Sequence, residues 1–178
     1  PVRNGGVVPL LFSLIFLHLA AAGGGLMALD SARSGKSSID NWFAKLAPLT
    51  LAILRVGAAF LFFQYGAGKT LAWFGGRRVR GISLLWVAGI METIGAPFIA
   101  LGLFTRSLAF LFSGEMAVAF WTSHFPRGPT IWPIQDGGEP AVLFCFIYLL
   151  MAAQGGGDWS VDAWLRGRFG SAAPSKHS

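Results

Sequence analysis

The sequence predicts an all-α membrane protein, with a four-helix transmembrane bundle and an additional transmembrane helix at the N-terminus. Its 178 residues are 54% hydrophobic and only 12% charged, and the mean hydropathy is +0.59. Soluble domains carry about 25% charged residues, and a single core of this size could not bury so much apolar surface. Lipid must therefore cover part of that surface.

Five apolar stretches account for the predicted helices. They run from about residues 7 to 29, 48 to 73, 82 to 104, 107 to 124 and 140 to 153. A helix needs about 20 residues to cross about 30 Å of hydrocarbon. The first four stretches are long enough. The fifth is short unless it continues through residues 155–157, so local thinning of the bilayer or burial against neighbouring helices must help it.

The first stretch has two interpretations. Arg3, an apolar core and small residues from 20 to 25 resemble a signal peptide. The sequence begins at Pro1 rather than Met, as it would if only an initiator Met had been removed, and we expect an uncleaved helix. We therefore divide the chain into an N-terminal helix with its loop (1–46), a four-helix membrane domain (47–165) and a polar C-terminal tail (166–178).

Short polar segments connect the later stretches. Thr105, Arg106 and Ser107 predict a tight turn, which would make the third and fourth helices antiparallel neighbours. Residues 125–140 contain four prolines and three glycines, which predict a loop.

The net charge of +6 invites a nucleic-acid partner, but the distribution of charge argues against one. Basic residues are scattered between apolar runs, with one tight cluster at Arg77, Arg78 and Arg80. Cationic residues at the ends of membrane spans contact anionic headgroups. We expect membrane lipids, and no nucleic acid, as partners.

Three ionisable residues lie inside apolar stretches: Arg55 in the second, Glu92 in the third and Glu115 in the fourth. An unpaired charge at that depth is costly, so these side chains should face the protein interior. We predict that Arg55 lies within salt-bridge or one-water distance of at least one carboxylate. One Arg against two Glu leaves an excess negative charge that one bound proton would remove. The three are candidate catalytic residues for proton handling; alternatively, they only hold three helices together.

A second polar group lies at one membrane face. Its candidate cofactor-binding residues are Gln64, Lys69, His124 and Glu139, with Asp136 beside them. Interfacial solvation would explain each residue alone, whereas the set could form the mouth of a site.

His18 lies within the first apolar stretch. The three histidines fall in different segments, without a second His at helical spacing. We therefore expect His18 to form a hydrogen bond between helices, and we predict no metal or haem site.

Several of these segments resemble the DoxX family of small bacterial membrane proteins. Residues 54–57 and 64–69 resemble the family's first helix, and residues 92–95 and 101–106 resemble its second helix and the turn that follows. His124, the motif at 137–139 and residues 157–162 continue the resemblance, which covers about residues 48–165. The family often has His where this chain has Gln64, and the first apolar stretch lies outside the usual four-helix core.

The resemblance implies a four-helix membrane module related to a subunit of thiosulfate:quinone oxidoreductase, in a family found beside redox enzymes. We therefore expect a multi-pass protein of the bacterial inner membrane. Its expected role is an accessory or structural subunit of a larger complex linked to respiratory or photosynthetic electron transfer. Other subunits would contact it partly through the N-terminal helix.

The alternative is a quinone-dependent oxidoreductase subunit in which Arg55, Glu92 and Glu115 handle quinol protons. Quinone would then be the cofactor, and none would be bound covalently. A small transporter ranks third, because inverted repeats and broken helices are not evident. A cavity that reaches Glu92 or Glu115 would favour the quinone hypothesis, and a dry, packed polar cluster would favour the structural one.

Overall fold

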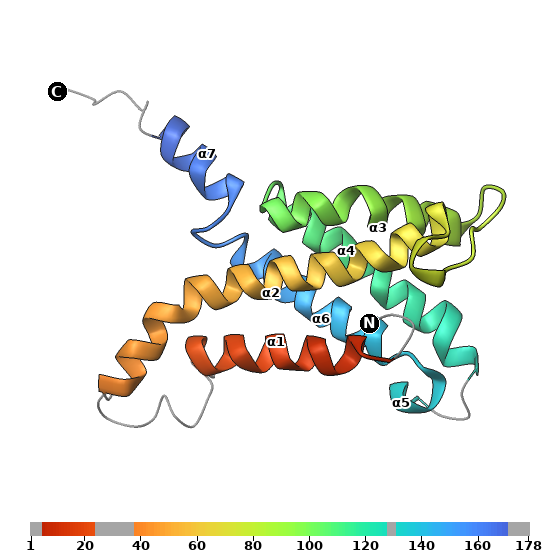
Figure 1. Cartoon of the computed structure of the whole chain (residues 1–178), viewed down its shortest axis with the longest axis horizontal. Helices are drawn as coiled ribbons and strands as arrows, with labels where there is room; N and C mark the ends of the chain where they lie inside the picture. The colour runs from red at the N-terminus through yellow and green to blue at the C-terminus, as the bar shows by residue number, and fades with distance from the viewer. Residues whose placement is uncertain (1–4, 24–37, 128–130, 171–178) are drawn as a thin grey trace.

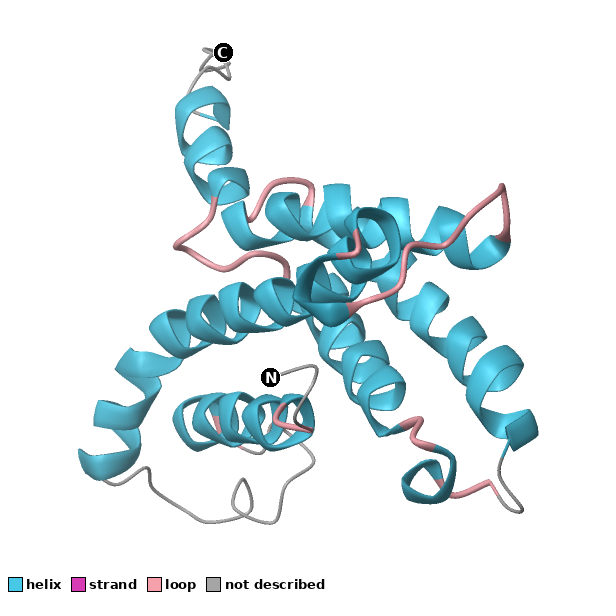
Figure 2. Cartoon of the chain, turned by 45° about the vertical axis from the view of Figure 1, so that its right-hand side comes forward, coloured by secondary structure: helices cyan, strands magenta, loops and turns pink. Residues whose placement is uncertain are grey.

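The computed structural model describes residues 5–23, 38–127 and 131–170, which are helical apart from short loops and contain no strand (Figures 1 and 2). The all-α prediction is confirmed for these residues. The end of the first predicted stretch (24–29) and the last residues of the predicted tail (171–178) lie outside them. The α-helices are α1 (Val7–Ala22), α2 (Ser38–Leu71), α3 (Leu84–Leu101), α4 (Thr105–Ala119), α5 (Pro133–Asp136), α6 (Glu139–Gln154) and α7 (Val161–Gly170).

Two helices are long and apolar enough to cross a membrane by length and composition, namely α2 over Asp40–Leu71 and α3. The apolar helices α1 and α6 are shorter, at 16 residues each. A π-helical segment, Phe120–His124, continues α4 without a break. Short 3-10 helices lie at Trp73–Gly75 and Phe125–Arg127.

Helix α2 begins ten residues before its predicted start at residue 48. Hydropathy marks where a helix enters an apolar environment, and not where its backbone hydrogen bonding begins. Residues 40–45, in the first turns of α2, are exposed and include Asp40, Asn41 and Lys45, so the helix continues beyond the apolar segment.

The turn between α3 and α4 also lies earlier than predicted. Gly102 and Phe104 adopt positive φ angles of 72° and 51°, while Thr105 and Arg106 already belong to the first turn of α4. The carboxylate of Asp162 accepts hydrogen bonds from the backbone amides of Phe104 and Thr105, each at 2.9 Å. A side chain from the far end of the sequence therefore caps α4, which a local turn prediction could not anticipate.

The helices pack around an aromatic core. The Phe62 ring of α2 lies 5.1 Å from Phe112 of α4, and 5.2 and 4.9 Å from Phe144 and Tyr148 of α6, between centroids. Such rings contribute large buried areas and favourable edge contacts. Helix α3 packs mainly along α2, and α4 along α6.

Helix α1 lies alongside α2 (Figure 1) and also contacts α6. Leu11 is fully buried, and His18 Nδ1 lies 3.1 Å from Thr50 Oγ1 of α2. The expected interhelical hydrogen bond of His18 is therefore confirmed. At the other end of the chain, α7 extends away from the packed helices (Figures 1 and 2).

Candidate functional site

Helices α2 and α3 approach closely where each carries a glycine. A Cβ on Gly66 would lie 2.5 Å from the Thr93 nitrogen, and one on Gly89 would lie 2.9 Å from the Lys69 Cβ. Small residues allow this approach. It places Lys69 opposite Gly89, which lies one helical turn before Glu92 on α3. The Lys69 Nζ lies 2.5 Å from Glu92 Oε1. The Glu92 side chain is 1% exposed, so this carboxylate is buried together with its cation.

Glu115 of α4 and Tyr148 of α6 complete a group that we call the inner polar cluster: Lys69, Glu92, Glu115 and Tyr148. Phe112 of α4 packs against Gly95 of α3, so the antiparallel register brings Glu115 to the level of Glu92. Tyr148 packs on the same Phe112 ring, with centroids 5.6 Å apart. Each of the four residues comes from a different helix. The cluster therefore lies where α2, α3, α4 and α6 come together.

Several polar atoms of this cluster are buried without a hydrogen-bond partner among the described residues. They are Glu92 Oε2, both carboxylate oxygens of Glu115 and the Tyr148 hydroxyl. A buried polar atom without a partner costs about 1–3 kcal/mol. Native proteins accept that cost mainly where an ion, a water molecule or chemistry uses the group. The cluster can therefore receive a hydrogen-bonding group.

The prediction that Arg55 pairs with Glu92 or Glu115 is wrong. The Arg55 Nη2 donates to the Trp159 carbonyl at 2.5 Å, and a Cβ on Gly102 would collide with its guanidinium. Gly102 lies ten residues beyond Glu92, which is about 15 Å of helix. Arg55 thus holds the segment before α7 against the α3–α4 turn, and Lys69 supplies the cation expected from Arg55.

The structure brings the second predicted group together only in part. Lys69 joins Glu92, whereas His124 Nδ1 lies 3.4 Å from the Asp136 carbonyl in the segment before α6. Gln64 is 3% exposed. Gly57 of α2 lies against Leu14 of α1. Because Gln64 is seven residues, or two helical turns, after Gly57, it falls on the same face of α2. Glu139 begins α6.

Tyr148 was not among the residues predicted for the site. It is one of two tyrosines in the chain and lies within the fifth apolar stretch. A buried Tyr hydroxyl normally requires a hydrogen-bond partner. That requirement is the sequence signal that could have identified it.

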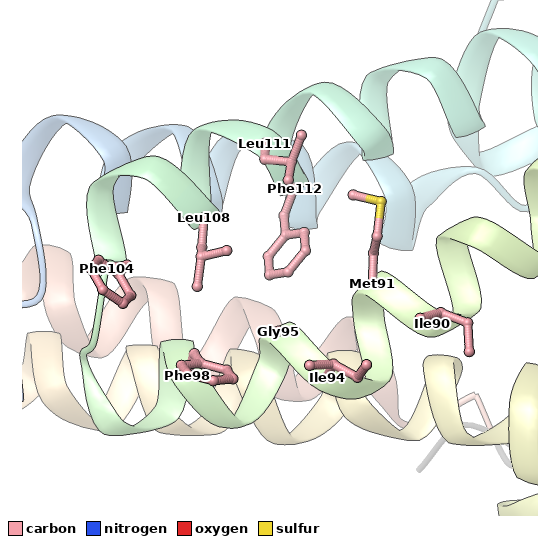
Figure 3. A pocket seen from close by; sticks show the side chains of 9 residues that line it. All are labelled: Ile90, Met91, Ile94, Gly95, Phe98, Phe104, Leu108, Leu111 and Phe112. Atoms are coloured by element: carbon pink, nitrogen blue, oxygen red, sulfur yellow. The ribbon is translucent and has the colours of Figure 1, made fainter.

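A groove of about 440 Å³ separates α3 from α4 (Figure 3). Apolar side chains and Gly95 line it, from Phe104 at the turn to Met91 at the opposite end, and neither Glu92 nor Glu115 is among the lining residues. The Phe112 ring closes its floor against Gly95, where a Cβ would lie 2.2 Å from the ring. The groove follows from the packing, because α3 and α4 rest on different partner helices.

Comparison with known proteins identifies the family. The DoxX family model matches residues 50–125. An uncharacterized protein of Haemophilus influenzae is 37% identical over 127 residues, which cover 68% of this chain and 95% of that relative. The chain belongs to the DoxX family. The DoxX match contains Lys69, Glu92 and Glu115, and the predicted resemblance is confirmed.

Membership of the DoxX family, together with the apolar helices, indicates a membrane protein. No solved structure matches the chain.

Proposed function

We propose that this DoxX protein is a quinone-linked subunit of a bacterial membrane complex, in which the inner polar cluster handles the protons of electron transfer. The observation that carries the proposal is the chemistry of Glu115. Both of its carboxylate oxygens are buried without a described partner, beside the Lys69–Glu92 ion pair. Ionisable groups placed inside a membrane protein are expensive, and proton relays are a common reason for their presence.

Charge balance supports the same proposal. The cluster contains one cation and two carboxyl groups, so it is electrically neutral only when one carboxyl carries a proton. Lys69 stabilises the ionised form of Glu92, whereas Glu115 has no ion pair with any described residue. Glu115 is therefore the residue that we assign to binding and releasing the proton.

The arrangement also offers a proton route. Lys69 is 23% exposed and Glu92 is 1% exposed, so the ion pair leads from the protein surface to the interior. A quinone takes up two electrons and two protons on reduction. In this proposal Glu115 donates a proton at the inner end of the route, Tyr148 orients the acceptor by a hydrogen bond, and Glu92 and Lys69 restore the proton.

The proposed architecture is the four-helix membrane domain at 47–165, formed by α2, α3, α4 and α6, with α1 as an added transmembrane helix. Residues 105–124 support α4 as a span, because twenty helical residues measure about 30 Å. We propose a multi-pass arrangement in the bacterial inner membrane. The electron donor belongs to another subunit of the complex.

The test replaces Glu115 with Gln in the native bacterium and measures quinone-dependent electron transfer in isolated membranes. Loss of a general acid typically slows a reaction by about 10²-fold or more, and we expect a decrease of that order with unchanged amounts of protein. Asp158→Asn, at an exposed acidic residue outside both predicted polar groups, is the matched control. Equal rates in both variants would refute proton handling by Glu115.

The second candidate is an accessory subunit without chemistry of its own, and the outer face of α1 favours it. Phe12 and Phe16 stack with centroids 5.8 Å apart, and Phe16 is 62% exposed. Such a face suits lipid or a neighbouring subunit. If this candidate is correct, Phe16→Ala releases the subunit from its complex while Glu115→Gln leaves electron transfer intact.

A further inference from the structure

We propose that the α3–α4 groove binds the apolar chain of a membrane-soluble molecule whose uncharged, hydrogen-bonding head contacts Glu115 and Glu92. The proposal rests on the proposed function for the identity of the head, which would be the group that exchanges protons with the cluster.

The walls of the groove suit an extended hydrocarbon chain. Ile94 and Phe98 form one wall on α3, and Leu108 and Leu111 form the other on α4 (Figure 3). Phe112 lies between them with its ring toward Gly95. A volume of about 440 Å³ is within the range of small-molecule sites, about 300–1,000 Å³.

The groove opens sideways, toward the surface that lipid would cover. Ile94 is 59% exposed and Leu111 is 49% exposed, although both line the groove. A chain could therefore enter from the bilayer without separating the packed helix pairs α2–α3 and α4–α6.

None of the four residues of the inner polar cluster lines the groove. Phe112 packs on Gly95, however, so one end of the groove lies at the helical level of Glu115 and Glu92. Met91 lines that end, whereas the next residue, Glu92, faces Gly66 and Lys69 of α2. Glu115 comes one turn after Leu111 on α4, so it continues the same helical stripe. The buried Glu92 Oε2 and the Glu115 oxygens have no described hydrogen-bond partner. A ligand head that passes Met91 could therefore satisfy these polar atoms.

Charge selects the type of head. Two carboxyl groups against Lys69 make the cluster neutral or negative, so a phosphate would meet repulsion and an unpaired buried charge. A head that is uncharged and both donates and accepts hydrogen bonds can contact the cluster in either protonation state. Ring carbonyl and hydroxyl groups meet this requirement, whereas ordinary phospholipid headgroups do not.

The experiment uses the purified full-length protein and a benzoquinone with a ten-carbon tail that carries a photoreactive group. We expect cross-links on α3 and α4 at residues that line the groove. Leu111→Trp fills the groove and should weaken binding by about tenfold or more, which corresponds to about 1.4 kcal/mol. Leu149→Trp, at a residue of α6 that is 45% exposed and outside the groove, should leave binding unchanged.

Two further results would overturn the proposal. In the first, phospholipid competes as well as unlabelled tailed quinone, which would mean that the groove holds only bilayer chains. In the second, Leu111→Trp and Leu149→Trp bind the probe equally well, which would place the chain elsewhere.

Failure of the groove proposal can be distinguished from failure of the proposed function. If Glu115→Gln impairs electron transfer but Leu111→Trp does not alter binding, the groove proposal fails and proton handling stands. If the probe binds in the groove but Glu115→Gln does not impair electron transfer, the binding site stands and the proposed function fails.

Discussion

Lys69 and Glu92 form an ion pair between α2 and α3, with Nζ 2.5 Å from Oε1 and the carboxylate almost completely buried. The pair exists because Gly66 and Gly89 allow the two helices to approach. It places a charged group at the point where four helices come together. The pair therefore links the packing of the helices to the chemistry that we propose for the cluster.

Replacing Lys69 with Met should destabilise the protein strongly, because Glu92 would be left without its cation. Breaking a buried pair costs about 3–5 kcal/mol, and protonation of Glu92 would reduce that cost. Unfolding in mild detergent measures the effect. The double variant Lys69→Met with Glu92→Gln should recover much of the loss, and Arg78→Met, at an exposed position, serves as the control. If the double variant is as unstable as the single one, the pair does not stabilise the fold as described.

Arg55 should act independently of Glu92. Arg55→Met removes the charged hydrogen bond to the Trp159 carbonyl, and bonds to charged groups contribute about 1.5–3 kcal/mol. Sites without shared partners are additive to within about 0.5 kcal/mol. A double-mutant cycle of Arg55→Met and Glu92→Gln should therefore show no coupling. A coupling energy well above that limit would indicate that Arg55 and Glu92 contact each other, as the sequence suggested.

Gly66 should tolerate no side chain. Gly66→Ala would place a Cβ 2.5 Å from the Thr93 nitrogen and 2.7 Å from the Glu92 Cβ, which would force α2 and α3 apart. Overpacking of this kind costs about 1–3 kcal/mol. Gly114→Ala is the matched control, since its Cβ would meet nothing within 4 Å and Ala favours a helix by about 1 kcal/mol. Similar thermal stability of the two variants would contradict the close approach.

Asp162 should make part of the stability dependent on pH. Burial raises the pKa of Asp162, but hydrogen bonds from the Thr105 and Phe104 amides outweigh that effect and hold the pKa below its ordinary value. The stabilisation is therefore complete above the ordinary pKa of about 3.9 and is lost as the pH falls through the lower folded value. Asp162→Ala should cost about 1 kcal/mol near neutral pH.

The cost of Asp162→Ala should shrink in acid, because the wild-type carboxylate then becomes protonated as well. Denaturant unfolding at a series of pH values measures the difference. Asp158→Ala, at an exposed residue nearby, should change stability little at any pH. A cost for Asp162→Ala that stays constant down to strongly acidic pH would contradict the capping role.

Hydropathy predicted the described helices well, because a lipid environment requires long apolar stretches. The second and third stretches correspond to α2 and α3, and the fifth to α6. The turn at Gly102 and the helix α7 were not predicted. Both depend on Asp162, whose carboxylate caps α4 and whose amide donates to the Gly102 carbonyl. A contact between residues almost sixty positions apart leaves no local pattern.

The candidate site was predicted in part. The depth of a residue in the membrane can be estimated from its position in an apolar stretch. The face of the helix on which it lies, and the register between neighbouring helices, cannot. Glu92 and Glu115 were recognised as buried acidic groups. Arg55 was expected beside them from its depth alone. Because Gly66 faces Glu92 and Thr93, the antiparallel register places Arg55 near Gly102. Lys69 lies opposite Gly89 and reaches Glu92 with its long side chain.

The most direct test of the central claim is infrared spectroscopy of the purified protein with the tailed quinone. If the inner polar cluster exchanges protons with the quinone, chemical reduction of the quinone should change the carbonyl stretch of a protonated carboxylic acid. This change should disappear in Glu115→Gln and remain in Asp158→Asn, at an exposed acidic residue outside both predicted polar groups. The same spectral change in Glu115→Gln as in the wild type, or no carboxyl signal in the wild type, would contradict it.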